Sequence, residues 1–76
     1  MQTPVRASAT KRFIDLATVA DVLAISVGKA YDLVRSGDLP AIQLGGRRQW
    51  RVETSVLDAF IARQYEQTRA ALALRR

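Results

Sequence analysis

The sequence predicts a mainly α-helical domain with a small β-hairpin. Two short segments of helical periodicity are separated by only three residues, and two β-prone runs follow around a Gly-Gly-Arg-Arg turn. A third helical segment comes after the hairpin. This order predicts a winged helix-turn-helix, in which the hairpin is the wing. We expect residues 13–62 to form this domain, residues 1–12 to be a flexible basic N-terminal arm, and residues 63–76 to be a helical extension or tail.

The first helix is predicted to begin after Asp15 and to end near Ala24. The Asp15 carboxylate is suited to accept a hydrogen bond from the amide of residue 17 or 18, as an N-cap does. Apolar residues then recur at the spacing of one buried helix face: Leu16, Val19, Ala20 and Leu23.

The second helix is predicted over residues 27–36, with Ser26 as its N-cap. Ala30 and Val34 lie four residues apart and form its apolar face. Gly37 supplies the left-handed residue that ends a helix, and Pro40 prevents continuation. The two helices therefore form a helix-turn-helix.

Two β-prone runs, residues 41–44 and 49–52, predict a hairpin with a cationic tip. A lone hairpin is unstable in water, so it must pack on the helices. We expect Trp50 to anchor it in the core, because an indole buries a large apolar surface.

The third helix is predicted to open at Glu53 or Thr54. Its apolar face closes the core, and it consists of Val56, Leu57, Phe60 and Ile61.

Composition narrows the classes of function. The 76-residue chain has no cysteine and no histidine, which excludes disulfides and thiolate metal sites and removes the commonest general base. We therefore expect no enzyme, no metal, no cofactor and no small-molecule ligand. The net charge is +5, which suits a polyanionic partner.

No apolar run approaches the ~20 residues of a membrane span, and no hydrophobic segment follows the N-terminal charges. We therefore expect no contact with a membrane and a location in the cytoplasm, at the nucleoid.

The segment from Ile14 to Ile61 resembles the excisionase-type members of the MerR-like winged-helix superfamily. The run from Arg35 to Pro40, followed by the Gly-Arg-Arg wing, carries the resemblance. It implies bacterial or phage DNA binding, by a small transcription factor or a recombination directionality factor. Compared with such relatives, the chain differs in having Ala24 in place of the glycine often found at the turn, and Gly28 within the second helix.

Residues for DNA contact come from the second helix and the wing. A helix-turn-helix presents the N-terminal half of its second helix to the major groove. The candidates on this helix are Ser26, Val27, Gly28, Lys29, Tyr31, Asp32 and Arg35. The candidates in the wing, which would lie on phosphates or in the minor groove, are Gly45, Gly46, Arg47, Arg48 and Arg51.

Purely structural explanations stay open for both the second helix and the wing. Tyr31 is as well explained by packing in the core as by DNA contact. The wing can also be read as an ordinary hairpin with solubilising arginines.

The function that we favour from sequence is sequence-influenced binding of double-stranded DNA by a small, non-enzymatic bacterial transcriptional regulator. The alternative is an excisionase-like or architectural, nucleoid-associated protein, with an integrase or the transcription machinery as partner. The resemblance also implies head-to-tail self-association on DNA. A protein-interaction module is the rival from another class.

Overall fold

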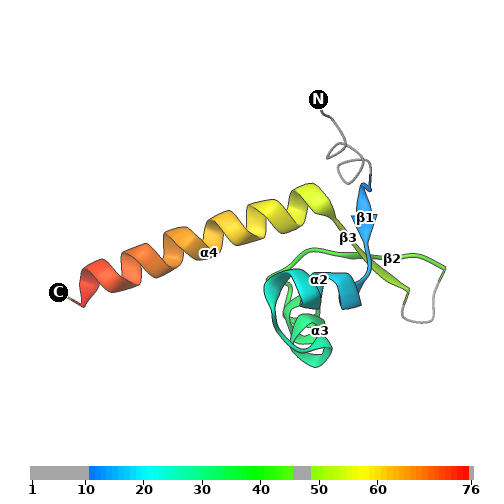
Figure 1. The fold of residues 1–76 in the computed structure, drawn as a ribbon, viewed down its shortest axis with the longest axis horizontal. Helices are drawn as coiled ribbons and strands as arrows, with labels where there is room; N and C mark the ends of the chain where they lie inside the picture. The colour runs from blue at the N-terminus through cyan, green and yellow to red at the C-terminus, as the bar shows by residue number, and fades with distance from the viewer. Residues whose placement is uncertain (1–10, 46–48, 76) are drawn as a thin grey trace.

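The computed structural model describes residues 11–45 and 49–75 of the chain. Along the chain the elements are β1 (Phe13–Ile14), α2 (Leu16–Leu23), α3 (Val27–Ser36), β2 (Ile42–Gln43), β3 (Trp50–Glu53) and α4 (Thr54–Leu74) (Figure 1). Most of the expected N-terminal arm, and Gly46, Arg47 and Arg48 of the wing, lie outside the described residues. The predicted winged helix-turn-helix fold is confirmed.

Helices α2 and α3 begin at the predicted caps. The Asp15 carboxylate accepts a hydrogen bond from the amide of Thr18 at 2.9 Å, and the Ser26 hydroxyl accepts one from the amide of Lys29 at 3.1 Å. These bonds satisfy amide donors that have no partner within the helix. The buried faces of the two helices consist of Leu16, Val19, Ala20, Ala30 and Val34.

The turn between α2 and α3 depends on an alanine in the left-handed conformation. Ala24 has φ 56° and ψ 46°, and its amide donates to the carbonyls of Ala20 and Asp21. An L-residue pays roughly 1–2 kcal/mol for this conformation, which glycine adopts without strain. The turn is tight despite the absence of glycine, and it stores that strain.

Three short strands form an antiparallel sheet in the order β1-β3-β2. Phe13 lies opposite Glu53, and Gln43 lies opposite Trp50. The sequence predicted β2 and β3 but not β1, which is too short to show a period of its own. An ion pair of 2.7 Å between Arg12 and Glu53 extends this pairing beyond β1.

Two features of the core differ from the sequence prediction. Trp50 is only half-buried at the edge of the core, whereas Val52, two residues further on β3, is fully buried. Leu39 lies between Gly37 and Pro40, in a stretch whose sequence indicates a turn after the second helix, but it is fully buried as well. Its amide donates to the carbonyl of Leu33 at 3.0 Å, and this bond folds the chain after Gly37 back over the core.

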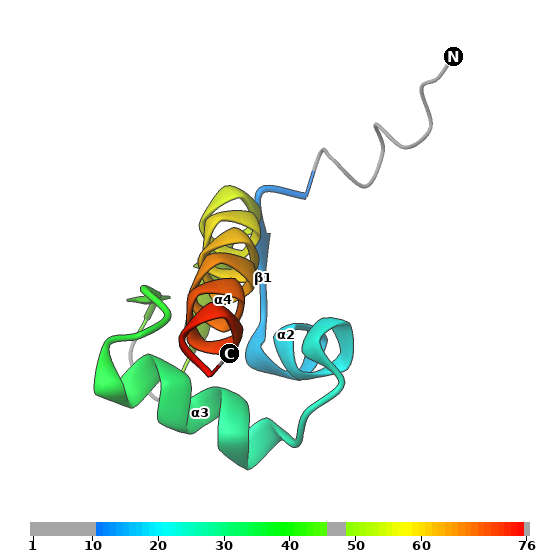
Figure 2. The same ribbon diagram turned by 90° about the vertical axis from the view of Figure 1, so that its left-hand side faces the viewer.

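Helix α4 packs on the sheet with its first two turns and then leaves the body of the domain. Leu57 and Phe60 are buried, whereas every described residue after Ile61 is exposed. Figure 1 shows the second half of α4 extending away from the other elements, and Figure 2, which looks nearly along α4, shows α2 beside it and α3 below it. Within the described ranges, no helix is long and apolar enough to cross a membrane.

Candidate DNA-binding surface

The face of α3 that points away from the core carries most of the candidate residues. Ala30 and Val34 are buried in the core, where α3 packs against α2, while Gly28, Asp32 and Arg35 are exposed. Positions 28, 32 and 35 share one side of a helix, because residues three and four apart are neighbours on its surface. This side of α3 is the part of the helix-turn-helix that remains available to a ligand.

The first turn of α3 carries small side chains and a single charge, that of Lys29. Ser26 uses its hydroxyl as the N-cap, and the Val27 side chain is 49% exposed. A Cβ placed on Gly28 would meet no atom closer than the Ser26 Oγ, at 3.9 Å. Packing inside the domain therefore does not require a glycine at this position. Lys29, fully on the surface, adds a positive charge to the same turn.

Tyr31 serves the core and the surface at once. Its ring is half-buried against the core, and the guanidinium carbon of Arg35 lies 5.6 Å from the ring centroid. A cation at this distance is attracted to the ring face. The packing interpretation therefore applies to Tyr31, whose ring also helps to fix the position of Arg35, while its contact with DNA stays a prediction.

A hollow between α3 and the sheet adds two residues that the sequence analysis did not place on the surface. Tyr31, Arg35, Gln43 and Trp50 line it. Gln43 and Trp50 are cross-strand partners, so their side chains lie on the same face of the sheet. The predicted hairpin already implied this pairing. Because Trp50 was expected to be buried in the core, its partial exposure on the surface was not predicted.

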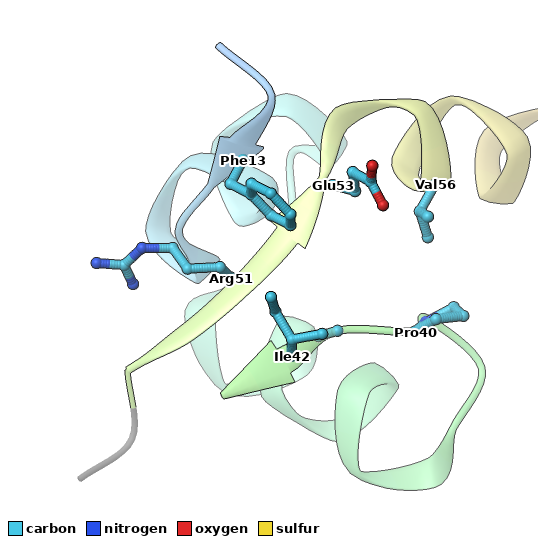
Figure 3. A pocket seen from close by; sticks show the side chains of 7 residues that line it. Phe13, Pro40, Ile42, Arg51, Glu53 and Val56 are labelled. Carbon is cyan, nitrogen blue, oxygen red and sulfur yellow. The ribbon is translucent and has the colours of Figure 1, made fainter. Parts of the chain in front are cut away.

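Arg51 lies on the other face of the sheet from Gln43 and Trp50. It is the cross-strand partner of Ile42, and it lines a hollow of about 130 Å³ whose other walls include Phe13 and Glu53 (Figure 3). Its guanidinium donates hydrogen bonds to the carbonyl oxygen of Trp50 at 2.8 Å and to Oε1 of Gln49 at 3.2 Å. The structure thus does not bring Arg51 together with the α3 residues.

The wing is described at its base only. Gly45 is exposed and has φ 68°, in the left-handed region that favours glycine, and the amide of Leu44 donates to the carbonyl of Gln49 at 2.9 Å. Gly46, Arg47 and Arg48 lie outside the described residues. Their contact with DNA stays a prediction.

Asp15, the N-cap of α2, has a shifted pKa. Hydrogen bonds from the side chain and the amide of Thr18 lower the pKa of Asp15 below its ordinary value, and the positive charge of Arg51 acts in the same direction. The charged carboxylate is therefore the form that caps α2. In the part of the chain that the structure describes, no group of three or more acidic residues is placed to hold a metal ion.

Comparison with known proteins identifies the family. No curated protein and no solved structure matches the chain. A family model described as a helix-turn-helix domain matches residues 13–65, which include all the elements above except the last part of α4. Such a domain implies binding to DNA. With more than half of its length matched, the chain belongs to this excisionase-type helix-turn-helix family.

Proposed function

We propose that the chain binds double-stranded DNA with the N-terminal half of α3 in the major groove and the wing on the adjacent backbone or in the minor groove. The observation that carries the proposal is the outward face of α3, whose exposed residues lie opposite its buried Ala30 and Val34. In this role it is a small transcriptional regulator at the bacterial nucleoid. It acts as a binding protein and not as an enzyme.

The chemistry of the α3 face is suited to partial reading of sequence. Lys29 can donate to a phosphate or to a guanine, and Asp32 can accept from the amino group of a cytosine. Gly28 lets the backbone of the first turn approach the floor or wall of the groove closely. Arg47 and Arg48 would supply sequence-independent affinity through phosphates.

The test is a titration of fluorescently labelled random-sequence duplex DNA, followed by anisotropy over a series of salt concentrations. Lys29→Gln is expected to weaken binding and to reduce the log-log salt slope by about 0.9, if Lys29 neutralises one phosphate. Arg69→Gln is the matched control, because it removes the same charge from an exposed pair with Glu66 on α4.

The outcome separates three cases. Loss of affinity in the Lys29 variant alone supports the α3 surface. Equal loss in both variants would mean that net charge, and not this surface, determines binding. A wild-type chain that binds no duplex at low salt would overturn the proposal in favour of a protein-interaction module.

The second candidate role is that of an excisionase-like or architectural protein, which the excisionase-type family favours. Such a protein bends DNA for an integrase, whereas a regulator acts on the transcription machinery. Both roles use the same DNA contacts, so the discriminating measurement is the bend angle. A circular-permutation gel assay that shows a strong bend, together with stimulation of excision by a purified integrase, would favour this candidate.

We also propose that several copies line up head-to-tail on DNA. A single small domain reads few base pairs, so one copy discriminates poorly among genomic sites. The exposed half of α4 offers a surface for a neighbour, because the Tyr65 and Leu72 side chains are 69% and 59% exposed.

A titration on DNA with one site against two adjacent sites tests this association. Ending the chain after Gln67 removes Leu72 but keeps Tyr65, so it should reduce cooperativity while it keeps the fold, because Arg63 is retained. Arg63 donates to the carbonyl of Asp38 at 3.1 Å and is the last residue of α4 with a hydrogen bond to another described element. Independent filling of two sites by the full chain, or a stable dimer without DNA, would contradict the proposal.

A further inference from the structure

The hollow between α3 and the sheet gathers polar side chains from three separate elements. Tyr31 and Arg35 come from α3, Gln43 from β2 and Trp50 from β3. The open space between them is about 430 Å³, which is larger than the hollow on the outer face of the sheet. Lining residues from different elements are 7–19 positions apart along the chain, so the fold, and not local sequence, brings these elements together.

The lining of this hollow is made of hydrogen-bond donors. A guanidinium and an indole N–H can only donate, while the hydroxyl of Tyr31 and the amide of Gln43 can each donate as well. Among the described residues, Arg35 is the charged residue that lines it, and no carboxylate does. A group that only accepts hydrogen bonds and carries negative charge satisfies all four side chains together.

The four groups are available to a ligand. Among the described residues, no hydrogen bond is formed by the guanidinium of Arg35, the hydroxyl of Tyr31, the amide of Gln43 or the indole N–H of Trp50. In the same part of the chain, no buried side-chain nitrogen or oxygen lacks a partner, so these groups are not sealed in the core. Arg35 and Gln43 are exposed, and Tyr31 and Trp50 are half-buried.

The position of the hollow identifies the source of such a group. It lies beside the second half of α3, past Gly28 and Lys29, and its other wall is the base of the hairpin that leads to the wing. A DNA strand that runs from the outward face of α3 to the base of the hairpin crosses this space. The hollow is open and shallow, which suits a backbone group passing over it better than an enclosed small molecule.

We propose that this hollow binds one phosphodiester group of the DNA backbone, with Arg35 supplying the charge and Gln43 and Trp50 supplying neutral donors. The inference rests on the proposed function and adds Gln43 and Trp50 to its contacts. Neutral donors hold the backbone at a fixed place without adding to the salt dependence of binding. The site thereby sets the position of α3 along the groove.

Trp50 provides a direct reporter, because it is the only tryptophan in the chain. We expect duplex DNA to change the intensity and wavelength of its emission, with the same midpoint as the anisotropy of labelled DNA. Inorganic phosphate, compared with sodium chloride at equal ionic strength, forms the second arm. It should leave the emission unchanged, because a single guanidinium holds a free anion only weakly in water.

Substitutions separate the neutral donors from the charge. Trp50→Phe keeps an aromatic ring at the core edge but removes the N–H, and we expect affinity to fall about 5- to 20-fold with an unchanged salt slope. Gln43→Met should behave in the same way, and Ser55→Ala, which removes an exposed neutral hydroxyl from the first turn of α4, is the control that binds as wild type. Arg35→Gln should lower the salt slope by about 0.9. A thermal melt of each variant shows whether it is folded.

The outcomes distinguish this inference from the proposed function. DNA binding by the wild-type chain with unchanged Trp50 emission, or with wild-type affinity in folded Trp50→Phe and Gln43→Met, would overturn the phosphate site and leave the α3 surface intact. A response of the emission to inorganic phosphate alone would assign the hollow to a free anion instead. Absence of any DNA binding would overturn both proposals.

Discussion

Replacing Gly28 with alanine tests where α3 meets DNA, because the two consequences of the change have opposite signs. In the isolated domain the added methyl group has room, since its nearest neighbour would be the Ser26 Oγ at 3.9 Å. Alanine is favoured over glycine in a helix by about 1 kcal/mol, and somewhat less in a first turn. We therefore expect Gly28→Ala to stabilise the fold by about 0.5–1 kcal/mol, which raises the melting temperature by roughly 2–8 °C.

The effect on DNA binding should be the reverse. If the backbone at Gly28 lies against the wall of the groove, a methyl group must displace α3 or the DNA. Inserting a methyl group into a closely packed contact costs about 1–3 kcal/mol. This corresponds to a loss of affinity of about 5- to 150-fold.

Thermal melting followed by circular dichroism, with anisotropy titrations on the same duplex, measures both effects. Thr68→Ala is the matched control, since it also improves helix propensity but lies on the exposed part of α4. It should raise stability slightly and leave affinity unchanged. A Gly28→Ala variant that is more stable and binds DNA as tightly as wild type would refute the close approach of this turn to DNA.

Further predictions concern the wing, the turn, the core and the first cap. Arg47→Ala with Arg48→Ala should weaken binding to all sequences about equally and reduce the salt slope by about 0.9 for each lost phosphate contact, so wild-type affinity at moderate salt would exclude a wing contact. Ala24→Gly should stabilise the domain by about 1 kcal/mol in urea unfolding by relieving the left-handed alanine, and an unchanged midpoint would show that the turn is not strained. Leu39→Ala should cost about 2–5 kcal/mol in the same assay, and a smaller loss would contradict its place in the core. Because the pKa of Asp15 is lowered in the fold, its contribution to stability is present above its ordinary value of 3.8 and is lost as the pH falls through the lower folded pKa. Asp15→Asn should keep the cap and remove this part of the acid dependence of stability. Thermal melts of both proteins at pH 7 and at about pH 3 measure the difference.

The helix-turn-helix could be predicted from sequence because its determinants are local. Asp15, Ser26 and Gly37 each act on amides or carbonyls within a few residues, and the structure has all three where the sequence suggests. The apolar spacing of each helix likewise needs only a window of about ten residues. The outward face of α3 follows directly from these two features.

The parts that escaped prediction depend on residues far apart in the chain. Strand β1 forms because Phe13 and Ile14 pair with β3. The sequence around positions 13 and 14 does not indicate this pairing, because the partner residues lie far along the chain. Leu39 lies two residues after Gly37 and directly before Pro40, so its sequence neighbours indicate a turn, although its side chain is buried in the core. Trp50 was expected in the core on the basis of size alone. The alternation of β3 puts Trp50 and Val52 on one face, but only the placement of the helices decides which of them is covered.

The candidate site divides in the same way. Residues of α3 could be assigned from helix geometry, whereas the hollow with Gln43 and Trp50 required the sheet to be placed beside α3. Arg51 was grouped with the other wing arginines by proximity in sequence. The pleat of β3 places Arg51 on the face of the sheet opposite Gln43 and Trp50.

The pairing of β1 with β3 has a consequence for the order in which the protein folds. Strand β1 leaves the ribosome well before its partner β3, since the Arg12–Glu53 pair spans 41 positions and the Thr54 amide donates to the Arg12 carbonyl at 2.8 Å. The helical hairpin of α2 and α3, by contrast, needs only its own residues. Contacts of long sequence separation form late, because loop closure must precede them. During synthesis the helical hairpin can therefore form before β1 pairs with β3. During refolding, the Ile14 amide should be the last to become protected from hydrogen exchange.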